Sequence, residues 1–410
     1  MFNKFNDSSF INENVVFTVC SVNYLAKAIV LMQSIEDEIS KVIFIADSKR
    51  KLEFNFGDIE IVFTEDIGID RYHELAFKYN IIEFNTCVKP YIAMNLLNNF
   101  QKVIYLDPDI YVYSSLNSVF EELKECSLLL TPHSFSSPGD NKRPSDVDLL
   151  KFGLYNLGFF ACKRDDNSKK ALSWWNSKLL EECFYEPGLG MGVDQKVAEL
   201  MPIFFDGVKI SNNLGLNLAF WNLHERFVNK DKNVYFVNGN CKLVFAHFSS
   251  YAGPNIVASK QTRFAKGDRL DFLELLANYE TKLEFITSKL NQEEKSYGYD
   301  YVNGYLITPL ARRYYHHMIK AGSAPSNPFD DLGFLKALKK KKFILFGKFS
   351  TSHVNFNEIS SQKNNIKIIA FMFRVVLKIL GPIRYYYFCT YINYITNTLN
   401  QGKILRGNKL

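Results

Sequence analysis

The stretch "VIYLDPDIYVYSSL", residues Val103 to Leu116, places two aspartates at the end of an otherwise apolar and aromatic strand. Asp107 precedes a proline, which biases its backbone to extended geometry, and positions i and i+2 of an extended segment point to the same side. Asp107 and Asp109 are therefore expected to aim two carboxylates at one point. Such a pair repels unless a cation lies between the two charges or one carboxylate binds a proton. Hard oxygen ligands of this kind suit Mg²⁺ or Mn²⁺. The alternative is a solvated Asp-Pro-Asp turn.

Apolar strands alternate with helices around this stretch. We expect strands over residues 14–22, 41–47, 59–66 and 102–107, with helical spacing after the first strand and over residues 86–100. This alternation predicts an α/β domain with a mostly parallel central sheet flanked by helices. Ligands of such sheets bind beyond the carboxyl ends of the strands. Asn23, Asp47 and Asp107 follow strand ends, so we expect them to converge on one crevice.

The pattern changes past about residue 256. Longer helical segments follow, such as 268–290, and residues 321–333 carry the turn-forming residues of a linker. We therefore expect three parts, residues 1–255, a helical extension over 256–335 and a tail over 336–410. The C-terminal region is expected to be mainly helical.

Charge is distributed unevenly along the chain. The net charge is +6, yet residues 333–410 hold 14 Lys and Arg against one acid, Glu358. The remaining residues hold 35 Lys and Arg against 42 Asp and Glu, a net charge of −7. A basic tail on an acidic body indicates an anionic partner for the tail, either a membrane surface or nucleic acid.

The composition also indicates the compartment. Hydrophobic residues make up 47% and charged residues 22% of the 410 positions, as in globular proteins. No run is apolar over the roughly 18 positions that a membrane-spanning helix needs, and the N-terminal residues lack the pattern of a signal peptide. Seven cysteines stand singly. This usage is typical of a reducing cytoplasm.

Several segments in order resemble retaining GT-A glycosyltransferases, especially family 8. "VIYLDPDIYVYSSL" resembles their D-x-D element, "YNLGFFACKR" their N-x-G strand, "GMGVDQKVAELMP" their D-Q motif and "VFAHFSSYAG" their late histidine motif. "EFNTCVKPYIAMNLL", "LLTPHS" and "NLAFWNLHER" are similar to segments of a group of bacterial surface-polysaccharide glycosyltransferases. The resemblance covers roughly residues 14 to 290. It implies a GT-A, Rossmann-like fold and a nucleotide-sugar-dependent hexosyltransferase, with residues 1–255 as the catalytic domain and 256–335 on the acceptor side.

The resemblance also implies roles for single residues. His247 joins Asp107 and Asp109 as the third protein ligand of Mn²⁺ or Mg²⁺, although a lone histidine also serves structural roles. Asp194 holds donor hydroxyls and Gln195 lies beside the anomeric carbon. Asp194 could instead cap the helix that it begins.

The remaining residues assigned to the donor or to the acceptor are weaker indications. Asn156 is expected to bind sugar hydroxyls, and Gly158 to let the backbone come close or to allow tight packing. Asn23 and Asp47 are candidates for the nucleoside and Lys89 for a phosphate. The acceptor side is expected to include Trp221, Asn222, His224 and Arg226.

These features predict a metal-dependent enzyme. It would move a hexose from a UDP-sugar to a cell-surface glycan or a lipid-linked acceptor, with retention of configuration. The alternatives are an inverting transferase with Asp194 as general base, and a catalytically inactive glycan-binding scaffold. Basic and aromatic residues interleave in the tail, which predicts a peripheral protein on the inner face of the cytoplasmic membrane. A subdomain packed on the core or a nucleic-acid patch are the competing interpretations of the tail, and we expect no nucleic acid.

Overall fold

The computed structural model describes residues 12–52, 56–290, 296–347 and 363–401, which form two compact units. The first unit comprises residues 1–72 and 81–298, and the second comprises 73–80 and 299–410. The second unit thus includes a short segment from the N-terminal half of the chain. Each unit has its own core.

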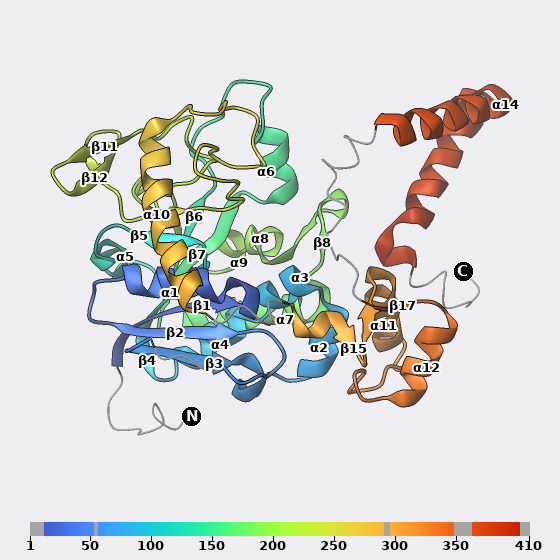
Figure 1. The fold of residues 1–410 in the computed structure, drawn as a ribbon, viewed down its shortest axis with the longest axis horizontal. Coiled ribbons are helices and arrows are strands. Elements are labelled where there is room, and N and C mark those ends of the chain that lie inside the picture. Colours follow the sequence, from blue (N-terminus) through green and yellow to red (C-terminus); the bar gives the residue numbers. More distant parts are fainter. Residues whose placement is uncertain (1–11, 53–55, 291–295, 348–362, 402–410) are drawn as a thin grey trace. The chain divides into compact units, whose positions relative to one another are not determined.

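A seven-stranded sheet forms the centre of the first unit (Figure 1). Only β7 runs against the other strands, since it pairs antiparallel with both of its neighbours while all other pairs are parallel. This confirms the predicted mostly parallel sheet. The strands in spatial order are β10 (Val208–Ile210), β6 (Leu128–Pro132), β7 (Tyr155–Lys163), β4 (Phe100–Leu106), β1 (Asn12–Cys20), β2 (Ser40–Ile45) and β3 (Ile59–Phe63).

The central strands are buried on both faces, as their nearly continuous apolar sequences require. Val16 and Ile104 face a core shared with α1 (Leu25–Ser34) and α10 (Leu270–Lys289). On the opposite face, Phe160 packs against Trp175 of α7 (Asp166–Glu182), with ring centroids 5.3 Å apart. Helix α10 therefore belongs to the core of the first unit.

The predicted helix over residues 86–100 is two helices, α3 (Ile81–Cys87) and α4 (Lys89–Leu96). Pro90 lies in the first turn of α4, where its missing N–H costs no hydrogen bond. Because α4 begins at Lys89, this lysine projects from a helix start beside the sheet. The other helices of the first unit are α5 (Asn117–Glu122), α6 (Asp146–Phe152), α8 (Val193–Ala198) and α9 (Met201–Phe204).

Short strand pairs extend the sheet's carboxyl edge. β5 (Ile110–Val112) pairs antiparallel with β14 (Phe245–His247), placing His247 opposite Ile110. This pairing connects the Asp107–Asp109 turn with a strand more than 130 residues away. The remaining strands of the unit are β8 (Tyr185–Glu186), β9 (Met191–Gly192), β11 (Val228–Asp231), β12 (Val234–Val237) and β13 (Cys241–Lys242).

The second unit is mainly helical, as predicted for the C-terminal region. Phe77 packs against Tyr315 and Phe334 in its core. Buried Arg312 donates to the carbonyls of Ala76, Phe77 and Tyr79 and pairs with Asp300 at 2.9 Å, which joins the short N-terminal segment to the unit. Its elements are α2 (Tyr72–Lys78), β15 (Tyr301–Val302), β16 (Tyr305–Ile307), α11 (Pro309–Lys320), α12 (Leu332–Lys340), β17 (Ile344–Phe346) and α14 (Lys363–Thr396).

Helix α14 bends at Gly381, whose φ of 72° is not helical, and at the following Pro382. The two arms meet through Phe373, whose ring lies 6.4 Å from that of Tyr385 and 6.2 Å from that of Phe388. Within the described residues, no helix combines the length and the apolar character needed to cross a membrane.

Candidate functional site

The turn from β4 to β5 carries Asp107 and Asp109 and is held by backbone hydrogen bonds. The N–H of Asp107 donates to the carbonyl of Gly158 at 2.7 Å, and the N–H of Phe248 donates to the carbonyl of Asp109 at 2.8 Å. Hydrogen bonds with β7 and with the residue that follows β14 therefore fix the turn on two sides. Both carboxylates emerge where β4 ends, as the sequence predicted.

Asp107, Asp109 and His247 form a compact group. One ligand atom from each lies within 4.8 Å of the others. Nε2 of His247 lies 2.9 Å from Oδ1 of Asp109 and 3.9 Å from Oδ2 of Asp107. Burial acts to raise the pKa of Asp109, but the adjacent His247, together with Lys27 and a backbone N–H, outweighs it and lowers that pKa to about 2. The group thus offers ionised oxygen and one imidazole nitrogen at a single point.

The surroundings of His247 fit a bound divalent cation. Nδ1 of His247 is buried and has no hydrogen-bond partner among the described residues, so the ring is held by packing and by the 2.9 Å contact of Nε2 with Asp109. A Cβ at position 158 would lie 2.5 Å from Cε1 of His247, so only glycine leaves room for the imidazole there. Two carboxylates and one imidazole are a donor set suited to Mn²⁺, and the carboxylates also suit Mg²⁺.

Lys89 connects this group with Asp194. Its Nζ lies 2.9 Å from Oδ2 of Asp194 and 3.3 Å from Oδ1 of Asp107, and it donates to the carbonyl of Leu157 at 3.1 Å. Burial acts to lower the pKa of Lys89, but the two carboxylates outweigh it and the net shift is upward. Lys89 is therefore a buried cation between two acids.

Asp194 does not cap its helix. The N-cap of α8 is Gly192, and no side chain caps the helix. Val193, which precedes Asp194, has a φ of 47°, a conformation that a β-branched residue rarely adopts. The indole N–H of Trp175 donates to the carbonyl of Asp194 at 3.3 Å. The unusual backbone conformation at Val193 therefore lies directly before Asp194, the residue whose side chain contacts Lys89.

Gln195 and Asn156 meet on the other side of this turn. Oε1 of Gln195 accepts from Nδ2 of Asn156 at 3.2 Å and from the N–H of Leu157 at 3.3 Å. Oδ1 of Asn156 accepts from Asn217 at 3.0 Å, and its Nδ2 lies 3.3 Å from Nε2 of His133. The structure therefore brings Asn156, predicted to bind sugar hydroxyls, into contact with Gln195, predicted to lie beside the anomeric carbon, in a partly buried amide cluster.

Asn23 and Asp47 both lie at strand ends, but only the side chain of Asn23 is accessible to a ligand. Asn23 is exposed, and its Oδ1 accepts from the hydroxyl of Ser21 at 2.8 Å. Asp47 is fully buried and accepts from the N–H groups of Val22, Ser48 and Gly298 and from Arg50. The carboxylate of Asp47 is therefore engaged with the chain itself, whereas the side chain of Asn23 remains accessible.

Of the four predicted acceptor-side residues, Trp221 packs against His247 of the Asp-Asp-His group. Its ring centroid is 5.2 Å from those of both His247 and His133. The other three bond mainly to nearby backbone. Asn222 bonds to Ala219, His133 and Asn217, His224 lies 3.0 Å from the carbonyl of Ser136, and Arg226 donates to Leu214 and Leu216.

Tyr105 and His133 belong to this region although the sequence analysis assigned them no role. Tyr105 donates to Oδ1 of Asp107 at 2.5 Å. Because residues two apart in a strand point to the same side, the position of Tyr105 two residues before Asp107 could have indicated this contact. His133 follows β6 directly, so its place at a carboxyl end was also visible in the sequence.

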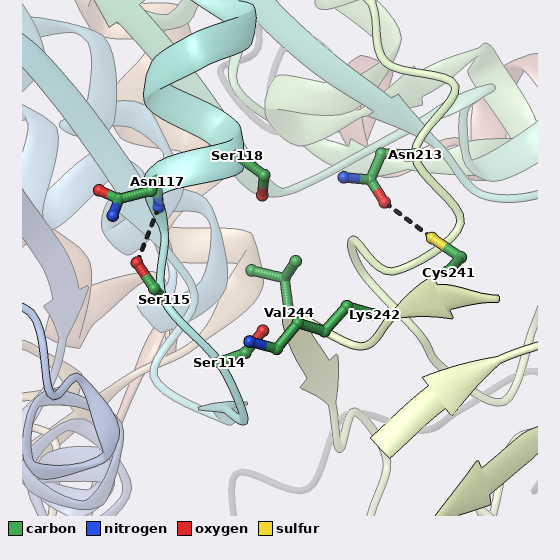
Figure 2. A pocket seen from close by; sticks show the side chains of 8 residues that line it. All are labelled: Ser114, Ser115, Asn117, Ser118, Asn213, Cys241, Lys242 and Val244. Carbon is green, nitrogen blue, oxygen red and sulfur yellow. Dashed lines mark hydrogen bonds between the residues drawn. The ribbon is translucent and has the colours of Figure 1, made fainter. Parts of the chain in front are cut away.

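A separate pocket of about 290 Å³ lies at the other end of the β5–β14 pair (Figure 2). Its walls are mostly small polar side chains, with Lys242 and Val244 completing the lining. Asn213 accepts from the thiol of Cys241 at 3.2 Å. The pocket is lined by Ser114, Ser115, Asn117, Ser118, Asn213, Cys241, Lys242 and Val244, so it contains none of the residues assigned above to donor, metal or acceptor.

No protein-family model matches the chain. Over 269 residues, 63% of this chain and 88% of the relative, it is 29% identical to the uncharacterized protein YfnF of Bacillus subtilis (strain 168). It is 28% identical to YfnD of the same organism over 41% of this chain and 54% of that relative.

Among solved structures, the chain is similar to the galactosyltransferase LgtC in complex with donor and acceptor sugar analogs. The identity is 18% and the TM-score 0.38, over 68% of this chain and 97% of that one. It is also similar to the bifunctional glycosyltransferase WbbM, at 14% identity and a TM-score of 0.41, over 69% of this chain and 53% of that one. The glycosyltransferase GlyE of Streptococcus pneumoniae TIGR4 matches at 14% identity and a TM-score of 0.38, over 69% of this chain and 66% of that one.

Proposed function

We propose that the chain is a metal-dependent GT-A glycosyltransferase that moves a hexose from a UDP-sugar to a cell-surface glycan or lipid-linked acceptor, with retention. The observation that carries this proposal is the convergence of Asp107, Asp109 and His247 on one point beside the buried Lys89–Asp194 pair. The resemblance of the surrounding motifs to family 8 enzymes supports the same assignment.

Asp107, Asp109 and His247 would hold the divalent cation. When bound, such a cation neutralises the charge that develops on a departing diphosphate, so no side chain has to protonate the leaving group. The residues around the group have the complementary task of placing the sugar. A diphosphate-binding cation beside a sugar-binding acid is the arrangement that this transfer requires.

Asp194, Asn156 and Gln195 would orient the donor sugar. Asp194 offers a carboxylate whose direction is fixed by Lys89 at 2.9 Å. Asn156 and Gln195 form a partly buried amide contact at 3.2 Å. The C1–O bond to the diphosphate breaks and a C1–O bond to the acceptor forms on the same face. The proton of the acceptor hydroxyl leaves with the nucleotide, and C1 passes through an oxocarbenium-like state.

We propose further that α14 lies on the anionic inner surface of the cytoplasmic membrane. Its 34 residues hold five Lys and Arg and no acid. Ile368, Met372 and Ile379 follow helical spacing on one side and are 62%, 60% and 75% exposed. An exposed apolar stripe beside cations supports an interfacial helix.

The enzymatic proposal is tested with the full chain and a panel of UDP-hexoses in the presence of Mn²⁺ or of a chelator. We expect Mn²⁺-dependent release of UDP, and its loss in Asp109→Asn while the melting temperature stays close to that of the parent. Asp231→Asn, which changes an exposed aspartate at the end of β11, is the matched control.

Two outcomes would replace this proposal. Release of UDP that ignores both the chelator and Asp109→Asn would remove the metal-dependent mechanism. Absence of metal-dependent nucleotide binding would favour the glycan-binding scaffold. NMR of the product's anomeric proton separates retention from inversion.

A further inference from the structure

The buried hydroxyl of Tyr105 contacts one oxygen of Asp107 and leaves the other free. It donates to Oδ1 at 2.5 Å, and Nζ of Lys89 approaches the same oxygen at 3.3 Å. Oδ2 is the oxygen that faces His247, at 3.9 Å. The carboxylate is thus held through one oxygen, and its second oxygen points into the Asp-Asp-His group.

The ring of Tyr105 is itself fixed. It is 1% exposed and stacks on Phe160, with centroids 5.3 Å apart and an angle of 22° between the planes. Phe17 packs on it with centroids 5.0 Å apart, and Nζ of Lys89 lies 4.5 Å from the ring centroid. Because aromatic groups and the lysine confine the ring, its hydroxyl has one place to donate.

The side chain of Asp107 is more exposed than those of the other two proposed metal ligands, so its surroundings restrict it less. Its side chain is 27% exposed, whereas those of Asp109 and His247 are 13% and 4% exposed. A partly exposed carboxylate can adopt other rotamers at little cost, and a change of rotamer changes the position of Oδ2 relative to His247. A ligand that is mobile before binding loses conformational freedom when it binds, which weakens affinity.

We propose that Tyr105 is a positioning residue for the metal site. It anchors Oδ1 of Asp107 so that Oδ2 is directed at the cation before the cation arrives. This inference rests on the proposed function, because it assumes that the Asp-Asp-His group holds a divalent ion. Partners that orient a metal ligand in this way typically affect metal affinity by roughly 10- to 100-fold.

The test is calorimetric titration of Mn²⁺ alone into the full chain and into Tyr105→Phe. Phenylalanine keeps the ring and its stacking on Phe160 but removes the hydroxyl. We expect Mn²⁺ affinity to fall by roughly 10- to 100-fold. Tyr113→Phe is the matched control, because Tyr113 also loses a hydroxyl that donates to one acceptor, the carbonyl of Leu275 at 3.0 Å, away from the Asp-Asp-His group.

Melting temperatures separate positioning from general stability. We expect Tyr105→Phe and Tyr113→Phe to shift the melting temperature by similar amounts, with Mn²⁺ affinity reduced only in the former. Parental affinity in Tyr105→Phe, or an equal loss in Tyr113→Phe, would overturn the inference and leave the proposed function standing. If the parent and Asp109→Asn both fail to bind Mn²⁺, the metal site and this inference fall together.

Discussion

Gly158 and His247 are in such close contact that no side chain fits between them. A Cβ added to Gly158 would lie 2.5 Å from Cε1 and 2.8 Å from Nδ1 of the imidazole. Gly158 also accepts from the N–H of Asp107 through its carbonyl, at 2.7 Å. One glycine therefore touches two of the three proposed metal ligands, and this contact gives a physical reason for the glycine in the N-x-G segment.

Gly158→Ala should displace His247. A methyl group at 2.5 Å requires the imidazole to move, so we expect Mn²⁺ affinity to drop by at least the roughly 10-fold that a lost orienting contact costs. Calorimetric titration and the melting temperature are the measurements. Gly188→Ala is the control, since nothing lies within 4 Å of a Cβ there. Unchanged Mn²⁺ affinity in Gly158→Ala would contradict the described packing.

Lys89→Met should leave Asp194 as an unpaired buried carboxylate. Removing one partner of a buried ion pair costs about 3–5 kcal/mol of unfolding free energy. Pairing the change with Asp194→Asn should restore part of this loss, because both charges are then absent. Urea unfolding of the two single variants and the double variant measures the coupling. Strictly additive effects would show that the 2.9 Å contact contributes nothing.

Val193→Gly should destabilise the chain less than a valine-to-glycine change inside helix α8. Val193 holds a φ of 47°, and strain of this kind costs on the order of 1–3 kcal/mol. Glycine removes the strain, which offsets the roughly 1.5–3 kcal/mol lost with the buried Val193 side chain and the about 0.5–1 kcal/mol lost to unfolded-state entropy. Thermal unfolding should show a smaller fall in melting temperature for Val193→Gly than for Val197→Gly, which lies inside α8. Equal destabilisation of both would mean that Val193 is not strained.

Burial lowers the pKa of His133 to about 4, from an ordinary value of 6.5. The unfolded chain therefore binds a proton below pH 6.5 that the folded chain does not, so stability falls as the pH drops from 6.5 toward 4. The loss attributable to His133 amounts to about 3 kcal/mol across that window. We expect His133→Asn to flatten the decline in urea midpoint over this range. Parallel pH profiles for parent and variant would refute the assignment.

Met372→Glu combined with Ile379→Glu should weaken the binding of the full chain to anionic liposomes. Both residues are exposed on one side of α14, and each glutamate replaces an apolar side chain with a charge that an anionic surface repels. Co-sedimentation measures the bound fraction. Leu310→Glu, at an exposed position of α11, controls for added negative charge. Equal partitioning of all three proteins would exclude α14 as the membrane contact.

The local pattern of apolar and polar residues in the sequence determined much of the fold of this protein. Alternating apolar strands and helices specified the mostly parallel sheet, because burial on both faces requires continuous apolar strands. Extended backbone at Asp107 and Asp109 placed both carboxylates on one side, since residues two apart share a face. The helix over residues 268–290 was also predicted closely, and α10 spans Leu270–Lys289. These features depend on neighbours in sequence.

Only the tertiary structure decided which distant residues complete the site. His247 reaches the aspartates because β14 pairs with β5 in one register. Lys89 became a buried cation because α4 starts beside β4 and α8. The four hydrogen bonds received by Asp47, one of them from Gly298, could not be foreseen from its own position. Side chains from remote segments acquire their partners and their pKa values from packing, and periodicity along the chain does not encode those contacts.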